Sequence, residues 1–151
     1  MNYLNITRFP PLDYACTEAM NTLCTNLSYC GADIRTILFT SRYEQEGKSS
    51  IAMNVMRTLA GYGKRVLLVD MDPQGNTTSG YGVQKRGVQK SVYSLLIGEA
   101  AARDVVIHTQ YRVDLIPSNI QLSGAGIELV ALERREARLR EALTPVVRDY
   151  D

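Results

Sequence analysis

A short stretch of this 151-residue sequence combines the residue types that bind phosphate. Gly47, Lys48 and Ser49 follow an apolar segment and precede a pattern of helical spacing. Backbone amides at the start of a helix, together with a lysine ammonium group, offer donors and positive charge to phosphate oxygens. A serine hydroxyl at this place can bind magnesium. The order strand, loop, Gly-Lys-Ser and helix therefore predicts a phosphate-binding loop.

The loop residues are expected to divide the work between backbone and side chains. Gly47 lets the backbone approach the phosphates, Lys48 adds a mobile charge that also serves catalysis, and Ser49 supplies an oxygen to magnesium. The first glycine of the pattern GxxxxGK[ST] is replaced by Arg42. The alternative interpretation is an exposed polar turn that caps an ordinary helix. The residues predicted to contact the nucleotide are Gln45, Glu46, Gly47, Lys48, Ser49 and Ser50.

Two acidic residues, Asp70 and Asp72, end the segment RVLLVDMD. If this segment is a parallel strand, both lie at the carboxyl edge of the sheet, where open α/β folds place their ligands. Asp70 is predicted to hold magnesium, directly or through water, and Asp72 to orient an attacking water or hydroxyl. The alternative is a pair of solvated turn carboxylates.

The segments around these residues alternate between strand-like and helix-like patterns. Thr36 to Thr40 (TILFT) and Arg65 to Asp70 (RVLLVD) are short apolar runs, which predict buried strands. The residues from 49 to 62 carry an apolar stripe at helical spacing, so the three segments predict one crossover unit. Upstream, Asp13 can cap a helix that Gly31 ends, with apolar positions at Cys16, Met20, Leu23 and Leu27.

The second half of the sequence adds a long polar segment and further elements. Residues 72–90 are rich in Gly, Asn, Thr and Ser and predict a loop, and Ser91 can cap a short helix that Gly98 ends. Val113 to Ile116 predicts another strand, and Leu122 to Leu143 one long helix. We therefore expect an α/β, three-layer fold of the P-loop NTPase type with a mainly parallel sheet. An irregular arm over residues 1–12 would precede a single, partial domain over residues 13–151.

Composition narrows the possible partners and the compartment. The formal net charge is +1, from 17 basic and 16 acidic residues, so bulk charge gives no reason to expect binding to nucleic acid or to a membrane surface. The sequence shows no signal peptide and no apolar run of transmembrane length. The three cysteines lack the paired spacing of a metal or redox site. These features predict a cytoplasmic protein.

The motifs resemble those of two families within one superfamily of P-loop ATPases. Residues 13–69 resemble bacterial tyrosine kinases of the capsule and exopolysaccharide systems, through TEAMNTLCTNLSYCG and ILFTSRYEQEGKSSIAMNVMRTLAGYGKRVLLVD. Residues 64–151 resemble the ParA/Soj chromosome-partitioning ATPases, through GKRVLLVDMDPQGNTTSGYGV, SVYSLLIGEA and VDLIPSNIQLSGAGIELV. The segment GKRVLLVD is typical of both families. The chain therefore resembles a hybrid.

The resemblance implies roles for matched residues only. In both families the matches to Gly47, Lys48 and Ser49 bind ATP phosphates and magnesium, and the matches to Asp70 and Asp72 form an acidic motif near the reaction centre. ParA-type proteins also carry an early loop lysine that reaches across an ATP-sandwiched dimer, and Tyr43 stands at that position. The kinases carry a glutamate and two arginines on the preceding helix, where this chain has Glu18, Asn21 and Cys24.

The end of the chain departs further from the partitioning family. In the partitioning ATPases, the segment that matches the last ten residues of this chain leads into the Walker B strand. That strand lies between the phosphate-loop strand and the strand that matches Arg65 to Asp70. The given sequence stops before this strand and before the family's adenine- and DNA-contacting portions. We therefore expect the backbone groups of the sheet to be unpaired or to pair differently. We also expect weak or absent turnover and no DNA contact of the family's kind. Three functions stay open: a magnesium-dependent ParA-type ATPase that could form a homodimer, a protein-tyrosine kinase, and a non-catalytic fusion remnant.

Overall fold

A three-stranded sheet forms the centre of the protein in a computed structural model that describes residues 11–31, 34–43 and 46–151. Strand β1 (Val66–Val69) pairs in parallel with β3 (Val113–Ile116), and β2 (Ile107–His108) pairs with β3 in antiparallel orientation. The strands predicted at 65–70 and 113–116 are therefore confirmed. The strand order is β1-β3-β2, so the sheet is small and mixed, and the expected mainly parallel sheet is only partly formed.

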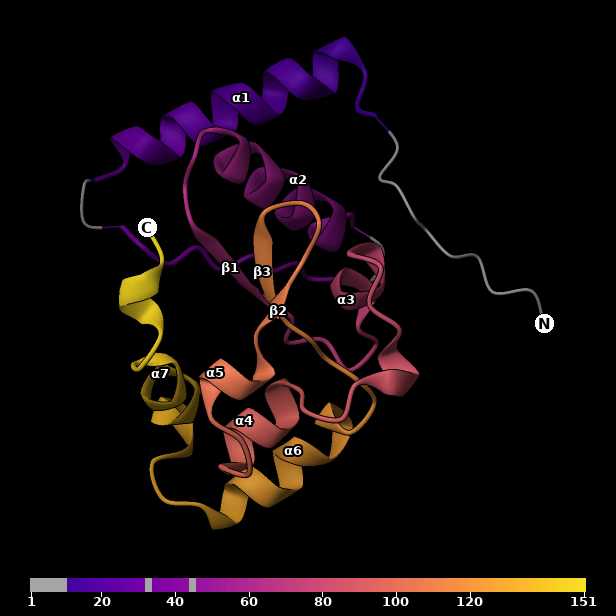
Figure 1. Ribbon diagram of the computed structural model, residues 1–151, viewed down its shortest axis with the longest axis vertical. Helices are drawn as coiled ribbons and strands as arrows, with labels where there is room; N and C mark the ends of the chain where they lie inside the picture. The colour runs from indigo at the N-terminus through magenta and orange to yellow at the C-terminus, as the bar shows by residue number, and fades with distance from the viewer. Residues whose placement is uncertain (1–10, 32–33, 44–45) are drawn as a thin grey trace, which may run out of the picture.

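Two long helices cover one face of this sheet. Helix α2 (Lys48–Gly61) packs on β1 and β3, and α1 (Tyr14–Tyr29) lies outside α2 (Figure 1). Asp13 caps α1 as predicted, because its Oδ1 accepts the N–H of Cys16 at 2.7 Å. This bond holds the pKa of the Asp13 carboxyl below its ordinary value. Residues 1–10 of the predicted arm lie outside the described residues.

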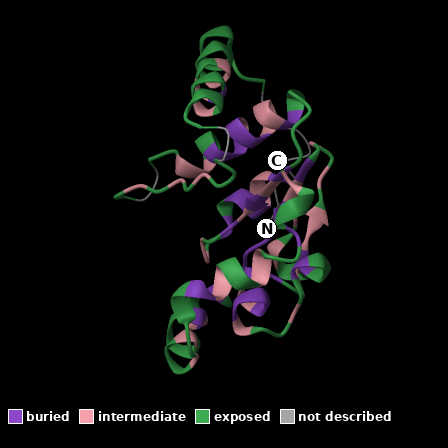
Figure 2. Ribbon diagram, turned by 90° about the vertical axis from the view of Figure 1, so that its left-hand side faces the viewer, coloured by how far each residue is buried: buried purple, intermediate pink, exposed green. Residues whose placement is uncertain are grey.

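The buried face of α1 differs by part of a turn from the predicted stripe. Cys16 is exposed, whereas Cys24 is fully buried with its Sγ 3.9 Å from the carbonyl oxygen of Val55. Burial raises the pKa of the Cys24 thiol. The remaining predicted positions, Met20, Leu23 and Leu27, pack partly buried against the same core. Figure 2 shows that most of α1 is exposed, so the helix contributes one narrow apolar face.

Short helices cover the other face of the sheet. They are α4 (Val92–Ile97), α5 (Ala102–Val105), α6 (Leu122–Glu128) and α7 (Arg138–Leu143). Because side chains alternate along a strand, Val66 and Leu68 of β1 join the core beneath α2, whereas Leu67 and Val69 join the core of the short helices. The predicted three-layer α/β architecture is confirmed. No helix in the described part of the chain is long and apolar enough to cross a membrane.

Two predicted elements of the second half differ in the structure. The predicted loop over 72–90 contains the short helix α3 (Asn76–Gly80) and a 3-10 turn (Lys85–Gly87). The predicted single helix over 122–143 is broken between α6 and α7, where Leu132 is extended and Arg134 has a φ of 54°. An unbroken helix of this length would extend about 33 Å. The break instead lets Leu129 and Leu139 pack against one core.

The prediction of a strand at Thr36 to Thr40 is wrong for this structure. The segment over residues 34–40 is assigned no strand, and among the described residues β1 has β3 as its single strand partner. Burial nevertheless alternates as in a strand, since Ile37 and Phe39 pack against the core beneath α2 while Leu38 is 85% exposed.

The last described residues lie beside the beginning of β1. Asp151 donates its N–H to the carbonyl of Arg65 at 3.0 Å, and its Oδ2 accepts the N–H of Arg65 at 2.8 Å. The hydroxyl of Tyr150 donates to Oδ2 of Asp114 in β3 at 2.8 Å. Burial and this hydrogen bond raise the pKa of Tyr150 well above its ordinary value. The end of the chain is thus fixed to two strands.

Two neighbouring substitutions test the alternation in the 34–40 segment. Phe39→Ser should lower the free energy of unfolding by about 2 kcal/mol, because it removes an aromatic side chain from the core. Leu38→Ser should change it by less than about 0.5 kcal/mol, because that side chain is exposed. Urea unfolding measures both. Equal losses would mean that the segment does not hold this orientation in solution.

Candidate phosphate-binding site

Gly47 is the residue that directly precedes α2 in the predicted phosphate-binding loop. Its φ of 81° is left-handed, and a Cβ at this position would meet no atom within 4 Å. Backbone conformation, and not crowding, therefore favours glycine here. The N–H of Ile51 donates to the carbonyl of Gly47 at 2.9 Å. Because Ile51 makes the first bond of the helix, the amides of residues 48–50 have no partner within it.

The first turn of α2 presents the predicted side chains. Lys48 and Ser49 are half-buried and Ser50 is exposed. The helix is 14 residues long, so its aligned peptide dipoles add positive potential at this end. Free amides, a lysine and a serine hydroxyl at one helix terminus match the donor set that phosphate and magnesium require.

A carboxylate closes the loop that precedes Gly47. Oε2 of Glu46 accepts the N–H groups of Arg42 at 3.1 Å and Tyr43 at 3.3 Å. The guanidinium carbon of Arg42 in turn lies 5.2 Å from the ring centre of Tyr43. Glu46 therefore has an observed role in shaping the loop, and its contact with a nucleotide stays a prediction. Gln45, also predicted to contact the nucleotide, lies outside the described residues.

Asp70 is buried at the end of β1, with 4% of its surface exposed. Its Oδ2 accepts both the N–H of Thr78 at 2.8 Å and the hydroxyl of Thr78 at 2.6 Å, and its Oδ1 accepts the N–H of Asp72 at 3.2 Å. Three donors satisfy this carboxylate without a metal. Its predicted contact with magnesium is not tested by these bonds, but direct ligation would compete with them.

Asp72 occupies a more open position at the same edge. It is half-buried, and its Oδ1 accepts the N–H of Gln74 at 2.9 Å, which folds the following turn. Its other carboxylate oxygen makes no hydrogen bond to the described residues. Of the two predicted acidic residues, Asp72 thus keeps an oxygen available for water or a metal-bound ligand.

Sequence reasoning missed the residues that support this edge. The N–H of Ser118, just beyond β3, donates to Oγ1 of Thr78 at 2.9 Å, which links the ends of β1 and β3 through Asp70. Gly75, with a φ of 58°, passes so close that a Cβ would lie 3.0 Å from the carbonyl oxygen of Ser118. A threonine and a serine in polar segments carry no pattern that would single them out.

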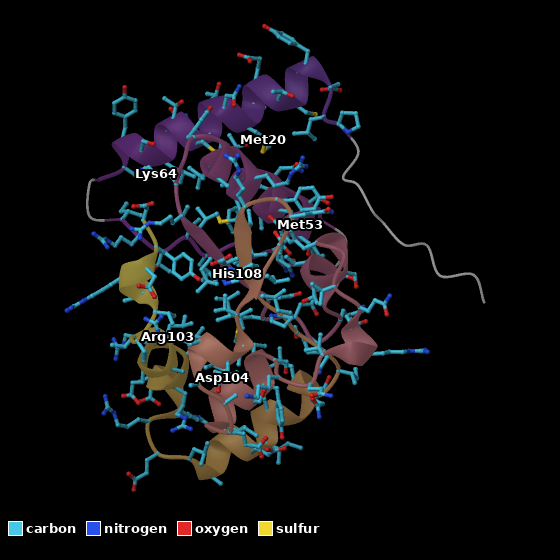
Figure 3. All side chains as sticks on the ribbon, in the orientation of Figure 1. Met20, Met53, Lys64, Arg103, Asp104 and His108 are labelled. Atoms are coloured by element: carbon cyan, nitrogen blue, oxygen red, sulfur yellow. The ribbon has the colours of Figure 1, made fainter. Side chains whose placement is uncertain are left out.

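One further side chain that could act in catalysis or metal binding, His108, lies away from this site. His108, labelled in Figure 3, has its Nδ1 2.7 Å from Oδ1 of Asp114 on the adjacent strand, and its side chain is 83% exposed. This pair lies at the β2 edge and forms a surface contact. Within the described residues, no group of three or more His, Cys, Asp and Glu side chains is arranged to hold a metal ion.

Fold and loop together define a P-loop class of protein, and comparison with known families agrees. Residues 35–151 match the model of the family described as "AAA domain". The match covers more than half of the chain, and the chain belongs to this family. It covers the predicted phosphate loop and the acidic edge of β1.

Individual relatives point to the ParA-type branch. The sporulation initiation inhibitor protein Soj of Bacillus subtilis is 45% identical over 118 residues, which are 78% of this chain and 47% of Soj. The chromosome partitioning protein ParA of Myxococcus xanthus is 36% identical over 78% of this chain and 42% of its own length. The chain thus spans less than half the length of these relatives. The resemblance of residues 13–69 to tyrosine kinases stays a prediction.

A solved enzyme structure has a similar fold. Cobyrinic acid a,c-diamide synthase from Mycobacterium smegmatis, with bound ATP analog and magnesium, superimposes with a TM-score of 0.71 at 32% identity. The match covers 74% of this chain and 46% of the synthase.

The two acidic residues should differ sharply in their contribution to stability. Asp70→Asn replaces one acceptor oxygen by an amide that faces the donors of Thr78, and should lower the free energy of unfolding by about 2 kcal/mol or more. Asp72→Asn keeps an oxygen for the Gln74 amide and should cost less than about 1 kcal/mol. Urea denaturation of both variants measures the difference. Equal costs would contradict a structural role for the Asp70 network.

Proposed function

We propose that this chain binds ATP together with magnesium at the start of α2, as a ParA-type P-loop protein. One observation carries the proposal: a left-handed Gly47 leads directly into the free amides of a 14-residue helix that begins with Lys48. The relationship to Soj and ParA supports it, as does the similar synthase structure with its bound ATP analog and magnesium. Residues 13–151 would act as one partial domain, because both core clusters share the central sheet.

Each residue of the site receives a role from its position. The amides of residues 47–50 and the ammonium group of Lys48 would hold the phosphates. Ser49 would ligate magnesium, and Asp70 would reach the ion through water because its oxygens already accept three donors. Asp72, with one oxygen available, would orient the water that attacks the terminal phosphate. Magnesium supplies charge neutralisation to the phosphates when bound.

Hydrolysis is the finer part of the proposal. We infer that any turnover by this chain takes place in a cytoplasmic homodimer, for which it offers Lys48 and Asp72 but carries Tyr43 in place of the early lysine. Radiolabelled ATP separates the functions that the sequence leaves open. Released phosphate supports a ParA-type ATPase, label on a protein tyrosine supports a kinase, and binding without either supports a nucleotide-binding remnant. Sedimentation with and without ATP tests the dimer.

Two lysines allow a matched test of binding, because Lys48 begins α2 and Lys64 follows the turn at its other end. Lys48→Ala should weaken ATP binding at least a hundredfold in isothermal titration, because it removes the charge that faces the phosphates. Lys64→Ala removes an equally charged, exposed side chain beyond the opposite end of the helix (Figure 3) and should leave the affinity within twofold. Unchanged ATP affinity in the Lys48 variant would refute the phosphate-loop assignment.

Magnesium should act through the serine hydroxyl. In wild-type protein, ATP affinity should rise when magnesium is added, and Ser49→Ala should remove most of that increase while leaving magnesium-free binding nearly unchanged. Ser50→Ala, one residue further along the same turn, provides the control for the magnesium response, because a contact of Ser50 with the nucleotide would change ATP affinity equally with and without magnesium. A full magnesium response in the Ser49 variant would place the ion elsewhere.

A further inference from the structure

A groove of about 460 Å³ lies away from the start of α2. It is bounded by the beginning of α1, by the later turns of α2 and by the turn that joins β2 to β3, which crosses over α2 in Figure 1. Its volume falls in the range of small-molecule sites. The lining residues that carry the argument are Thr17, Asn54, Arg57, Thr58, Tyr111 and Arg112.

The charged residues that line the groove are both arginines. Arg57 comes from α2 and Arg112 from the turn between β2 and β3, and among the described residues no acidic side chain lines the groove. Asp13, which follows the lining residue Leu12 in sequence, has its Oδ1 engaged by the amide of Cys16. A concave surface lined by two guanidinium groups favours an anionic occupant.

The guanidinium of Arg57 is held in place by aromatic packing. Its central carbon lies 5.2 Å from the ring centre of Tyr111. That ring meets the ring of Tyr81 edge-on, with 5.9 Å between centres and 64° between planes. Tyr81 is itself buried and donates its hydroxyl to the carbonyl of Met53 at 3.2 Å. A guanidinium fixed in this way loses little freedom when it binds a ligand.

Arg112 is positioned by a constrained turn. Its φ is 58°, an uncommon value for a residue other than glycine. The hydroxyl of Thr109 donates to the carbonyl of Val113 at 2.7 Å, and the N–H of Tyr111 donates to that hydroxyl oxygen at 3.3 Å. These bonds hold the turn closed around Arg112. The side chain is exposed and makes no ion pair within the described part of the chain.

We propose that this groove binds a small ligand carrying two anionic groups, either carboxylates or phosphates. Arg57 and Arg112 would each form a charge-assisted contact with one group, since a guanidinium matches both kinds of oxyanion. Thr17, Asn54 and Thr58 add polar side chains along the same walls. The site is separate from the proposed ATP site, so its test does not depend on nucleotide binding.

The test uses the full chain carrying Lys48→Ala, without magnesium and at 150 mM salt, so that the phosphate loop does not compete. Pyrophosphate and citrate are titrated separately by isothermal titration and by amide chemical shifts. At least one should bind, with shifts at Arg57, Thr58 and residues 109–113. Arg112→Gln should weaken that binding about tenfold. Arg140→Gln, which removes an exposed arginine from α7, should leave it unchanged.

Further variants separate binding from folding. Arg57→Lys keeps the charge but loses the planar fork and should weaken binding severalfold, with the urea midpoint reported alongside. If only citrate binds, the ligand of the groove carries carboxylates; if only pyrophosphate binds, it carries phosphates. If each of the two binds, the groove selects for negative charge and not for the kind of oxyanion. The proposal is overturned if neither anion binds below 10 mM, if Arg140→Gln weakens binding as much as Arg112→Gln, or if the shifts map to residues 47–50.

Discussion

The hydrogen bonds to the buried Asp70 carboxylate are the constraint on which the described architecture depends most. A charge at the end of an apolar strand is tolerated in the interior only because donors surround it. Thr78 supplies two of them, and Ser118 extends the connection to the end of β3. The single parallel strand pair, the α3 turn and the edge that carries Asp72 are therefore held in one arrangement. A network of this kind fixes geometry because each group would be costly to leave unpaired.

Helix α2 connects this edge to both candidate ligand sites. Its buried residues, among them Val55 and Met56, fill the core against β1 and β3, so the helix cannot shift without disturbing the sheet. Its first turn presents free amides and Lys48, and its later turns present Arg57 to the groove. Both sites are cationic although the chain as a whole is nearly neutral, with a formal net charge of +1. Local arrangement, and not bulk charge, is therefore the basis of the proposed preference of both sites for anions.

The segment over residues 34–40 lies at the start of the region that the AAA domain family model matches. The family model matches residues 35–151, and this chain spans less than half of the length of Soj and ParA. Ile37 and Phe39 still pack inward while Leu38 faces solvent, which is the pattern of a strand without a hydrogen-bonded neighbour. Burial of apolar side chains thus orients this segment, although it pairs with no strand among the described residues.

Features that rest on local chemistry could be predicted from the sequence. These are the Asp13 and Ser91 caps, the helix that follows Gly47, the strands at 66–69 and 113–116 and the three-layer class, because caps, turns and apolar runs depend on neighbouring residues. The tertiary structure alone decided the rest. The strand pattern at 36–40 found no partner, the apolar pattern over 122–143 broke at Leu132, and Asp70 turned inward to Thr78. The groove between Arg57 and Arg112 joins residues 55 positions apart. Such outcomes depend on contacts between distant segments, which no local pattern encodes.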